Sequence, residues 1–192
     1  MSRQVVMGWI LYSKKLILVH DTGCYTCWHI RIVSQFKEKR IMKNILIREC
    51  THHDLESIFQ LDQLWDEENI AYVFTYESRE DFIADFERFQ KYFLVAESEG
   101  QIVGYANGSV RVNKTVAILP KQEMYLEIEN IYVLPKYRNR SVGGDLLEKL
   151  LKVAEQNGIK RFFVSTVTKD MDRILRFYRD HDFNPWYVEL FK

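Results

Sequence analysis

The chain has few of the residues that would place it in a special structural class. Its 192 residues include only three cysteines, three prolines and eight glycines. Three cysteines cannot form an even disulfide framework, so we expect a reducing, cytoplasmic setting. No apolar run approaches the roughly 18 residues of a membrane-spanning helix, and we find no internal repeat or low-complexity tract. What is present is an ordinary globular composition and enough length to bury a substantial core.

The net charge is zero, but the two signs are unevenly distributed. Residues 1–41 contain 7 Lys/Arg against 2 Asp/Glu, and the remaining residues contain 20 against 25. A basic segment ahead of an acidic domain occurs in nucleic-acid and membrane tethers. We predict no nucleic-acid partner, because the domain itself is acidic, and no membrane partner.

The first 41 residues show no clear hydrophobic period. The apolar stretch 5–19 is broken by Ser13-Lys14-Lys15 and is followed by no small-residue cleavage site, so we do not expect a signal peptide. Met42, a short polar lead and an apolar segment then read as a fresh start. We therefore expect 1–41 to be a poorly ordered or over-long extension, and 42–192 to be the functional domain.

Cys24 and Cys27 form a C-x-x-C pair within that extension. Zinc would require a second pair of ligands, and only Cys50 and His52-His53 lie nearby. A redox site would require a strand before the pair and a helix after it, which the flanking residues do not support. We predict two unrelated cysteines and no bound metal.

Apolar periodicity and turn signals predict a mixed α/β fold. Thr51 and Asp54 form a capping-box pattern, and Ser78 and Asp170 are typical helix N-caps. A tight turn at 99–100 and a bend or bulge at 106–108 interrupt the strands. The expected order is strand 44–49, helix 53–64, helix 78–89, strands 92–97, 101–112 and 124–134, helix 144–157, strand 161–168, helix 170–180 and strand 186–191. This order gives a mixed, mainly antiparallel central sheet with helices on both faces.

The most informative stretch runs from Met124 to Leu151 and reads as a strand, a basic glycine-bearing loop and an amphipathic helix. A loop that opens a helix gathers backbone N–H groups at the positive end of the helix dipole, where anions bind. The strand carries Glu127 and Glu129 two positions apart, so both carboxylates project from one face. An anion site beside paired acids favours an enzyme.

The segment 65–76 is acidic and aromatic. It is either a solvated turn or a segment whose carboxylates, Asp66, Glu67 and Glu68, attract a cationic or amine-bearing partner.

The chain resembles the GNAT superfamily of acetyl-coenzyme-A-dependent N-acetyltransferases. The loop resembles the family's [Q/R]-x-x-G-x-[G/A] pyrophosphate motif, read here as Arg138-Asn139-Arg140-Ser141-Val142-Gly143. Ile131-Tyr132-Val133-Leu134-Pro135 before it is similar to the family's fourth strand and its turn. Phe177-Tyr178 and Asp182-Phe183 resemble the motif F-Y-x-x-x-G-F. Ser141 and Asp182 stand where these motifs have glycine, and a left-handed backbone at Ser141 would cost on the order of 1 kcal/mol.

The resemblance implies that a neutral amine attacks acetyl-CoA directly in a ternary complex. Glu129 would be the base, with Glu127 as the runner-up, and Tyr178 would protonate the departing thiolate. The pantetheine arm would pair with the backbone near Ile131 and Val133. The other expected coenzyme-binding residues are Tyr132, Arg138, Asn139, Arg140, Ser141, Val142, Gly143 and Gly144.

The acceptor stays open at this point. A small-molecule amine, a peptide N-terminus, a lysine side chain and an aminoglycoside-like drug all fit, and a homodimer is compatible with the sequence. The alternative function is a non-catalytic acyl-CoA-binding or sensing module, which the serine at position 141 makes more credible.

Overall fold

The computed structural model describes residues 8–12, 15–19, 45–70, 78–166 and 168–188. The chain divides into two compact units, Met1–Lys43 and Asn44–Lys192, which are described separately. In the first unit, β1 (Gly8–Tyr12) pairs antiparallel with β2 (Lys15–Val19). The C-x-x-C pair lies outside the described residues, so its interpretation stays a prediction.

The second unit is built on a five-stranded sheet in the order β3-β4-β5-β6-β7. All neighbours pair antiparallel except β6 and β7, which are parallel. The strands are β3 (Ile45–Glu49), β4 (Phe93–Ser98), β5 (Gln101–Val112), β6 (Met124–Val133) and β7 (Phe162–Val164). The predicted mixed, mainly antiparallel fold is confirmed.

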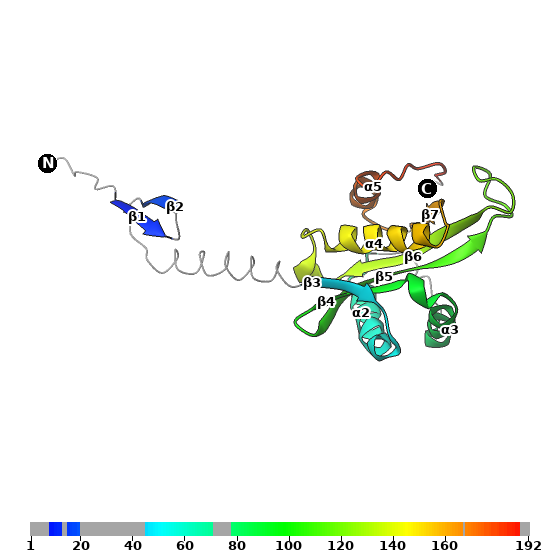
Figure 1. Ribbon diagram of the computed structural model, residues 1–192, viewed down its shortest axis with the longest axis horizontal. Coiled ribbons are helices and arrows are strands. Elements are labelled where there is room, and N and C mark those ends of the chain that lie inside the picture. The colour runs from blue at the N-terminus through cyan, green and yellow to red at the C-terminus, as the bar shows by residue number, and fades with distance from the viewer. Residues whose placement is uncertain (1–7, 13–14, 20–44, 71–77, 167, 189–192) are drawn as a thin grey trace. The chain divides into compact units, whose positions relative to one another are not determined.

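Helices cover both faces of this sheet (Figure 1). Helices α2 (Leu55–Glu67) and α3 (Arg79–Phe89) lie on one face, and α4 (Val142–Gln156) and α5 (Met171–Arg179) lie on the other. Short 3-10 turns precede α2, β4 and the basic loop: η1 (His52–Asp54), η2 (Gln90–Tyr92) and η3 (Pro135–Tyr137). Fully buried side chains form the core on both sides, including Phe82 and Phe86 of α3 and Leu146, Leu147 and Leu150 of α4.

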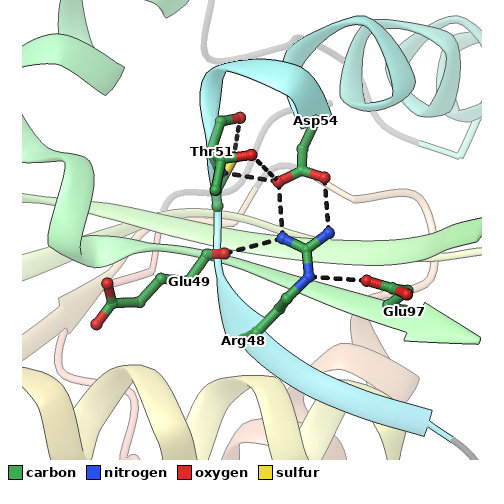
Figure 2. Close-up of polar contacts among 6 residues, drawn as sticks. Arg48, Glu49, Thr51, Asp54 and Glu97 are labelled. Carbon is green, nitrogen blue, oxygen red and sulfur yellow. Dashed lines mark hydrogen bonds and ion pairs between the residues drawn. The ribbon is translucent and has the colours of Figure 1, made fainter. Parts of the chain in front are cut away.

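The predicted capping box joins the first strand of the sheet to α2. The Thr51 backbone N–H donates to the Asp54 carboxylate at 2.8 Å. Arg48 donates two further hydrogen bonds of 2.7 Å to that carboxylate, and its Nε donates to Glu97 of β4 at 2.8 Å (Figure 2). These hydrogen bonds, chiefly those from Arg48, lower the pKa of Asp54 to about 2. The predicted caps at Ser78 and Asp170 are confirmed, since each side chain accepts a backbone N–H of its helix.

Two predicted strands differ from the structure. The strand expected over 161–168 ends at Val164, because the chain then leaves β6 and Thr168 and Lys169 bind the carbonyl of Ile70 instead. No strand forms over residues 184–188, where the Trp186 ring lies 5.9 Å from that of Phe163. The rest of that expected strand lies outside the described residues, as does the second half of the acidic and aromatic segment, residues 71–76.

Candidate functional site

Strand β6 carries a bulge that reverses the direction of its backbone groups. Asn107 pairs with Asn130 and Gly108 with Ile128, so Glu129 is an extra residue on β6. This bulge is the irregularity predicted near 106–108, although its extra residue lies on the partner strand. The Leu126 N–H points toward β7, donating to Arg161 at 2.9 Å, whereas the Leu134 N–H points toward β5. Positions 126 and 134 would face the same way in a regular strand, so the bulge turns the backbone over between them.

The reversal leaves part of β6 with an open edge. The pairing with β7 covers only Leu126 to Ile128, and β6 continues to Val133. Since Leu134 donates to β5, alternation directs the N–H groups of Ile131 and Val133 away from β5, toward the gap beyond the end of β7. An edge of this kind can accept an extended amide-bearing chain as an added strand.

The basic loop continues from this edge into α4. Its backbone is left-handed at Asn139, with φ of 58°, and at Ser141, with φ of 63°. Ser141 is the residue before α4, and its side chain makes no capping hydrogen bond. The first N–H groups of α4 therefore have no acceptor within the helix and lie at the positive end of its dipole. Ser141 thus has the left-handed conformation whose cost the sequence analysis considered, and Asp182 adopts one too, with φ of 66°.

The two arginines of the loop differ in their partners. Arg138 donates from Nη1 and Nη2 to the Glu68 carboxylate, each at 2.6 Å, and from Nε to the Val133 carbonyl at 2.7 Å. Arg140, by contrast, has a buried Nη1 with no hydrogen-bond partner. A buried guanidinium nitrogen left unpaired carries a desolvation cost that an anion would relieve.

The paired acids of β6 share one guanidinium. Arg111 of β5 contacts Glu127 at 3.3 Å and Glu129 at 3.1 Å, and Ser109 donates to Glu129 at 2.5 Å. Both carboxylates therefore lie on one face, as predicted. Burial and the neighbouring Glu129 charge raise the pKa of Glu127, and Arg111 offsets this only in part.

Tyr178 lies on α5, and the residues next to it contact the start of α4. A methyl group at Gly143 would meet the Phe177 ring at 3.7 Å and Val133 at 3.9 Å. At Gly144 it would meet His181 Nε2 at 2.9 Å, so a side chain here would require the His181 ring to move. Tyr178 itself is 9% exposed, and burial raises the pKa of its hydroxyl.

The structure thus brings β6, the loop and α5 together, and separates the two expected proton carriers by face. Glu129 contacts Ser109 and Arg111 of β5. These two residues lie an even number of positions from Tyr105 and so share its face of the sheet. The Tyr105 ring meets Phe82 of α3, so this is the face that α2 and α3 cover. Tyr178 belongs to α5 on the opposite face (Figure 1).

Sequence reasoning missed the partners of the functional side chains. Arg111 could have been found by extending the hairpin register from the turn at 99–100, because the strand opposite the acids must carry their neighbours. Glu68 appeared only as one of three acidic residues, and nothing local marks it as the partner of Arg138.

Within the ranges that the structure describes, no three His, Cys, Asp or Glu residues are grouped to hold a metal ion. Nor is any helix in those ranges long and apolar enough to cross a bilayer.

Comparison of the sequence with known proteins gives a consistent result. A sequence profile of the acetyltransferase (GNAT) family matches residues 53–183. An N-alpha-acetyltransferase of Sulfurisphaera tokodaii is 26% identical over 123 residues, covering 64% of this chain and 70% of that protein. An amino-acid acetyltransferase of Aeromonas salmonicida is 27% identical over 142 residues; the match covers 74% of this chain but only 27% of that enzyme.

Solved structures share the fold. The aminoglycoside N-acetyltransferase AAC(6')-Iy, in complex with a bisubstrate analog, has a TM-score of 0.60 at 19% identity, with 78% of this chain and 97% of that chain covered. Glucosamine-6-phosphate N-acetyltransferase from Arabidopsis thaliana has a TM-score of 0.54 at 19% identity, covering 78% and 98%.

Proposed function

The chain belongs to the acetyltransferase (GNAT) family, and from this premise we propose that it transfers an acetyl group from acetyl-CoA to a primary amine. Membership makes the chain an acyltransferase. In the proposed reaction acetyl-CoA is the donor, both substrates are bound together, and the amine attacks the thioester directly.

The coenzyme side is supported by one observation above all: an open strand edge, a helix N-terminus and an unpaired buried arginine nitrogen lie in sequence along one stretch. The backbone of Ile131 and Val133 suits the amide-bearing pantetheine arm. The N–H groups at the start of α4, with Arg140, suit the pyrophosphate. Acetyl-CoA supplies an activated acetyl group as a thioester, so no metal is required.

The acid–base chemistry is assigned to residues on opposite faces of the sheet. The amine nitrogen bonds to the carbonyl carbon and the carbon–sulfur bond breaks. Glu129 accepts the proton that the amine loses, and Tyr178 donates a proton to the departing thiolate. Because burial raises the pKa of Tyr178 above its ordinary value of about 10, the hydroxyl holds its proton at neutral pH.

The acceptor is proposed to be a small-molecule or peptide amine. Glu127 and Glu129 place two carboxylates beside Arg111, and carboxylates favour the approach of an ammonium group. The relatives are described as acting on N-alpha groups and amino acids, and the structural neighbours include aminoglycoside enzymes.

Calorimetric titration with acetyl-CoA and with S-acetylpantetheine, which lacks the nucleotide and its pyrophosphate, tests the assignment of the loop. We expect acetyl-CoA to bind at least about tenfold more tightly, because charge-assisted hydrogen bonds to the pyrophosphate are lost in the shorter compound. Arg140→Gln should narrow this difference, whereas Arg88→Gln on α3 should not. Equal affinities of the wild-type protein for the two compounds would contradict the pyrophosphate site.

A further inference from the structure

Hydrogen bonds to Glu68, the residue that follows α2, connect α2 to the basic loop (residues 138–144). The Glu68 carboxylate accepts two hydrogen bonds of 2.6 Å from Arg138 and one of 2.7 Å from the Tyr132 hydroxyl. The side chains of Arg138 and Glu68 are only 22% and 21% exposed. A bidentate pair shielded in this way has both strength and a fixed direction, unlike an exposed ion pair.

Glu68 is itself held in place on both sides along the chain. Trp65, one turn earlier in α2, stacks on the Tyr132 ring with centroids 5.2 Å apart. Two residues later, the Ile70 carbonyl accepts from the Lys169 N–H at 2.8 Å and from the Thr168 hydroxyl at 3.1 Å. The carboxylate is therefore presented from a fixed backbone.

Arg138 connects the Glu68 carboxylate, which acts as a fixed anchor, to the loop. Its Nε is bound to the carbonyl of Val133, at the end of β6, while its own backbone leads into Asn139 and Ser141, both left-handed. A left-handed backbone is strained at a non-glycine residue and persists only where its surroundings enforce it. The bidentate pair supplies such a constraint at the first residue of the loop.

We propose that Glu68 is a positioning residue for coenzyme binding. It holds the Arg138 side chain in one orientation and so keeps the loop backbone in the conformation that binds the pyrophosphate. This inference rests on the proposed function. It also assigns Arg138 a different task from Arg140. Burial raises the pKa of Glu68, but the hydrogen bonds from Arg138 and Tyr132 outweigh that effect and lower it overall, so the anchor is charged at neutral pH.

The test compares Glu68→Gln with Glu56→Gln, which removes an exposed glutamate–arginine pair from the same helix. In Glu68→Gln we expect Kd and KM for acetyl-CoA to rise roughly tenfold, from the loss of charge-assisted hydrogen bonds, and kcat to stay within about twofold. Arg138→Gln should match it, and the double variant should be no worse than either single variant. Tyr132→Phe, which keeps the ion pair, should give a smaller rise in the same direction. Glu56→Gln should leave all three constants unchanged.

The opposite role for Glu68 gives the opposite result. If Glu68 instead withheld Arg138 from the phosphates, Glu68→Gln would bind acetyl-CoA more tightly, and that outcome or an unchanged Kd would overturn the inference. If the wild-type protein bound no acetyl-CoA, the proposed function would fail. Hydrogen exchange of the coenzyme-free protein then still tests whether Glu68 holds the loop backbone through Arg138. Amides 139–144 should exchange faster in Glu68→Gln than in the wild type, and equal rates would contradict the inference.

Discussion

In the proposed reaction single side chains carry the chemistry, and Tyr178 is assigned the most specific task, protonation of the departing thiolate. Its side chain is buried, and burial raises the pKa of the hydroxyl, which therefore keeps its proton at neutral pH. Tyr178→Phe should lower kcat by roughly a hundredfold with little change in the Kd of acetyl-CoA, because the ring stays and only the proton donor is lost. Steady-state kinetics and titration measure both. Tyr92→Phe, at another buried tyrosine, should leave kcat unchanged; unchanged turnover in Tyr178→Phe would remove its assignment as the acid.

The two acids of β6 can be separated by their response to pH. Glu129→Gln should reduce kcat at pH 7 much more than Glu127→Gln does, because only the former removes the proposed base. The deficit should shrink as the pH rises toward the pKa of the amine, since the free amine then needs no base. Rate profiles of both variants from pH 6 to 10 measure this. A deficit in Glu129→Gln that is constant with pH would indicate a structural role, and a larger deficit in Glu127→Gln would exchange the two residues.

At the scale of elements, the start of α4 meets the α5 region where Gly143 faces Phe177 and Gly144 faces His181. A methyl group at Gly143 would make ordinary van der Waals contacts. One at Gly144 would lie 2.9 Å from His181 Nε2, so the His181 ring would have to move. Gly143→Ala should therefore keep or raise the free energy of unfolding, by up to about 1 kcal/mol from helix propensity. The free energy of unfolding of Gly144→Ala should be about 1–3 kcal/mol lower than that of Gly143→Ala, because the added methyl group overpacks the contact with His181.

The matched rescue is Gly144→Ala combined with His181→Ala, which removes the ring that the new methyl group would meet. Chemical denaturation of the variants should show the double variant more stable than the sum of the two single changes predicts. Strict additivity would mean that the ring moves aside without cost.

The elements that were predictable from the sequence are those with local signals. The caps at Ser78 and Asp170 depend on neighbours within a few positions, and the structure confirms them. The irregularity beside Gly108 also has a local signal, but its extra residue, Glu129, lies on β6. The strand expected beyond Val164 was wrong, because β-propensity does not reveal that its partner strand diverges there. The Glu68–Arg138 pair joins positions 70 apart, and no periodicity of one chain encodes such a contact.

For the molecule as a whole, stability in acid should depend on the partly buried Asp62. Burial raises its pKa to about 6, although a hydrogen bond from Tyr105 lowers it in part. The folded protein therefore holds this proton more tightly than the unfolded chain, whose carboxyl has a pKa of about 3.9. The resulting stabilisation is present below about pH 4 and is lost as the pH rises toward 6, by at most about 3 kcal/mol.

Asp62→Asn should remove that loss, so its free energy of unfolding should change less than that of the wild type between pH 4 and 6. Denaturant unfolding at several pH values measures the slopes, with Asp66→Asn on the same helix as the control. Asp54 does not interfere in this window: its pKa is lowered to about 2, so its contribution is complete above about pH 4 and is lost only in stronger acid. Equal slopes in Asp62→Asn and wild type would show that Asp62 titrates normally.

Acetyl transfer itself is tested most directly by thiol release. The full-length protein is incubated with acetyl-CoA and a panel of amines (amino acids, peptides with free N-termini, lysine side chains and aminoglycosides), and free coenzyme A thiol is measured. We predict release that requires both the protein and at least one amine class, and that falls in Tyr178→Phe. Stabilisation of the protein by acetyl-CoA with no amine-dependent thiol release would contradict the proposed reaction and favour a binding module.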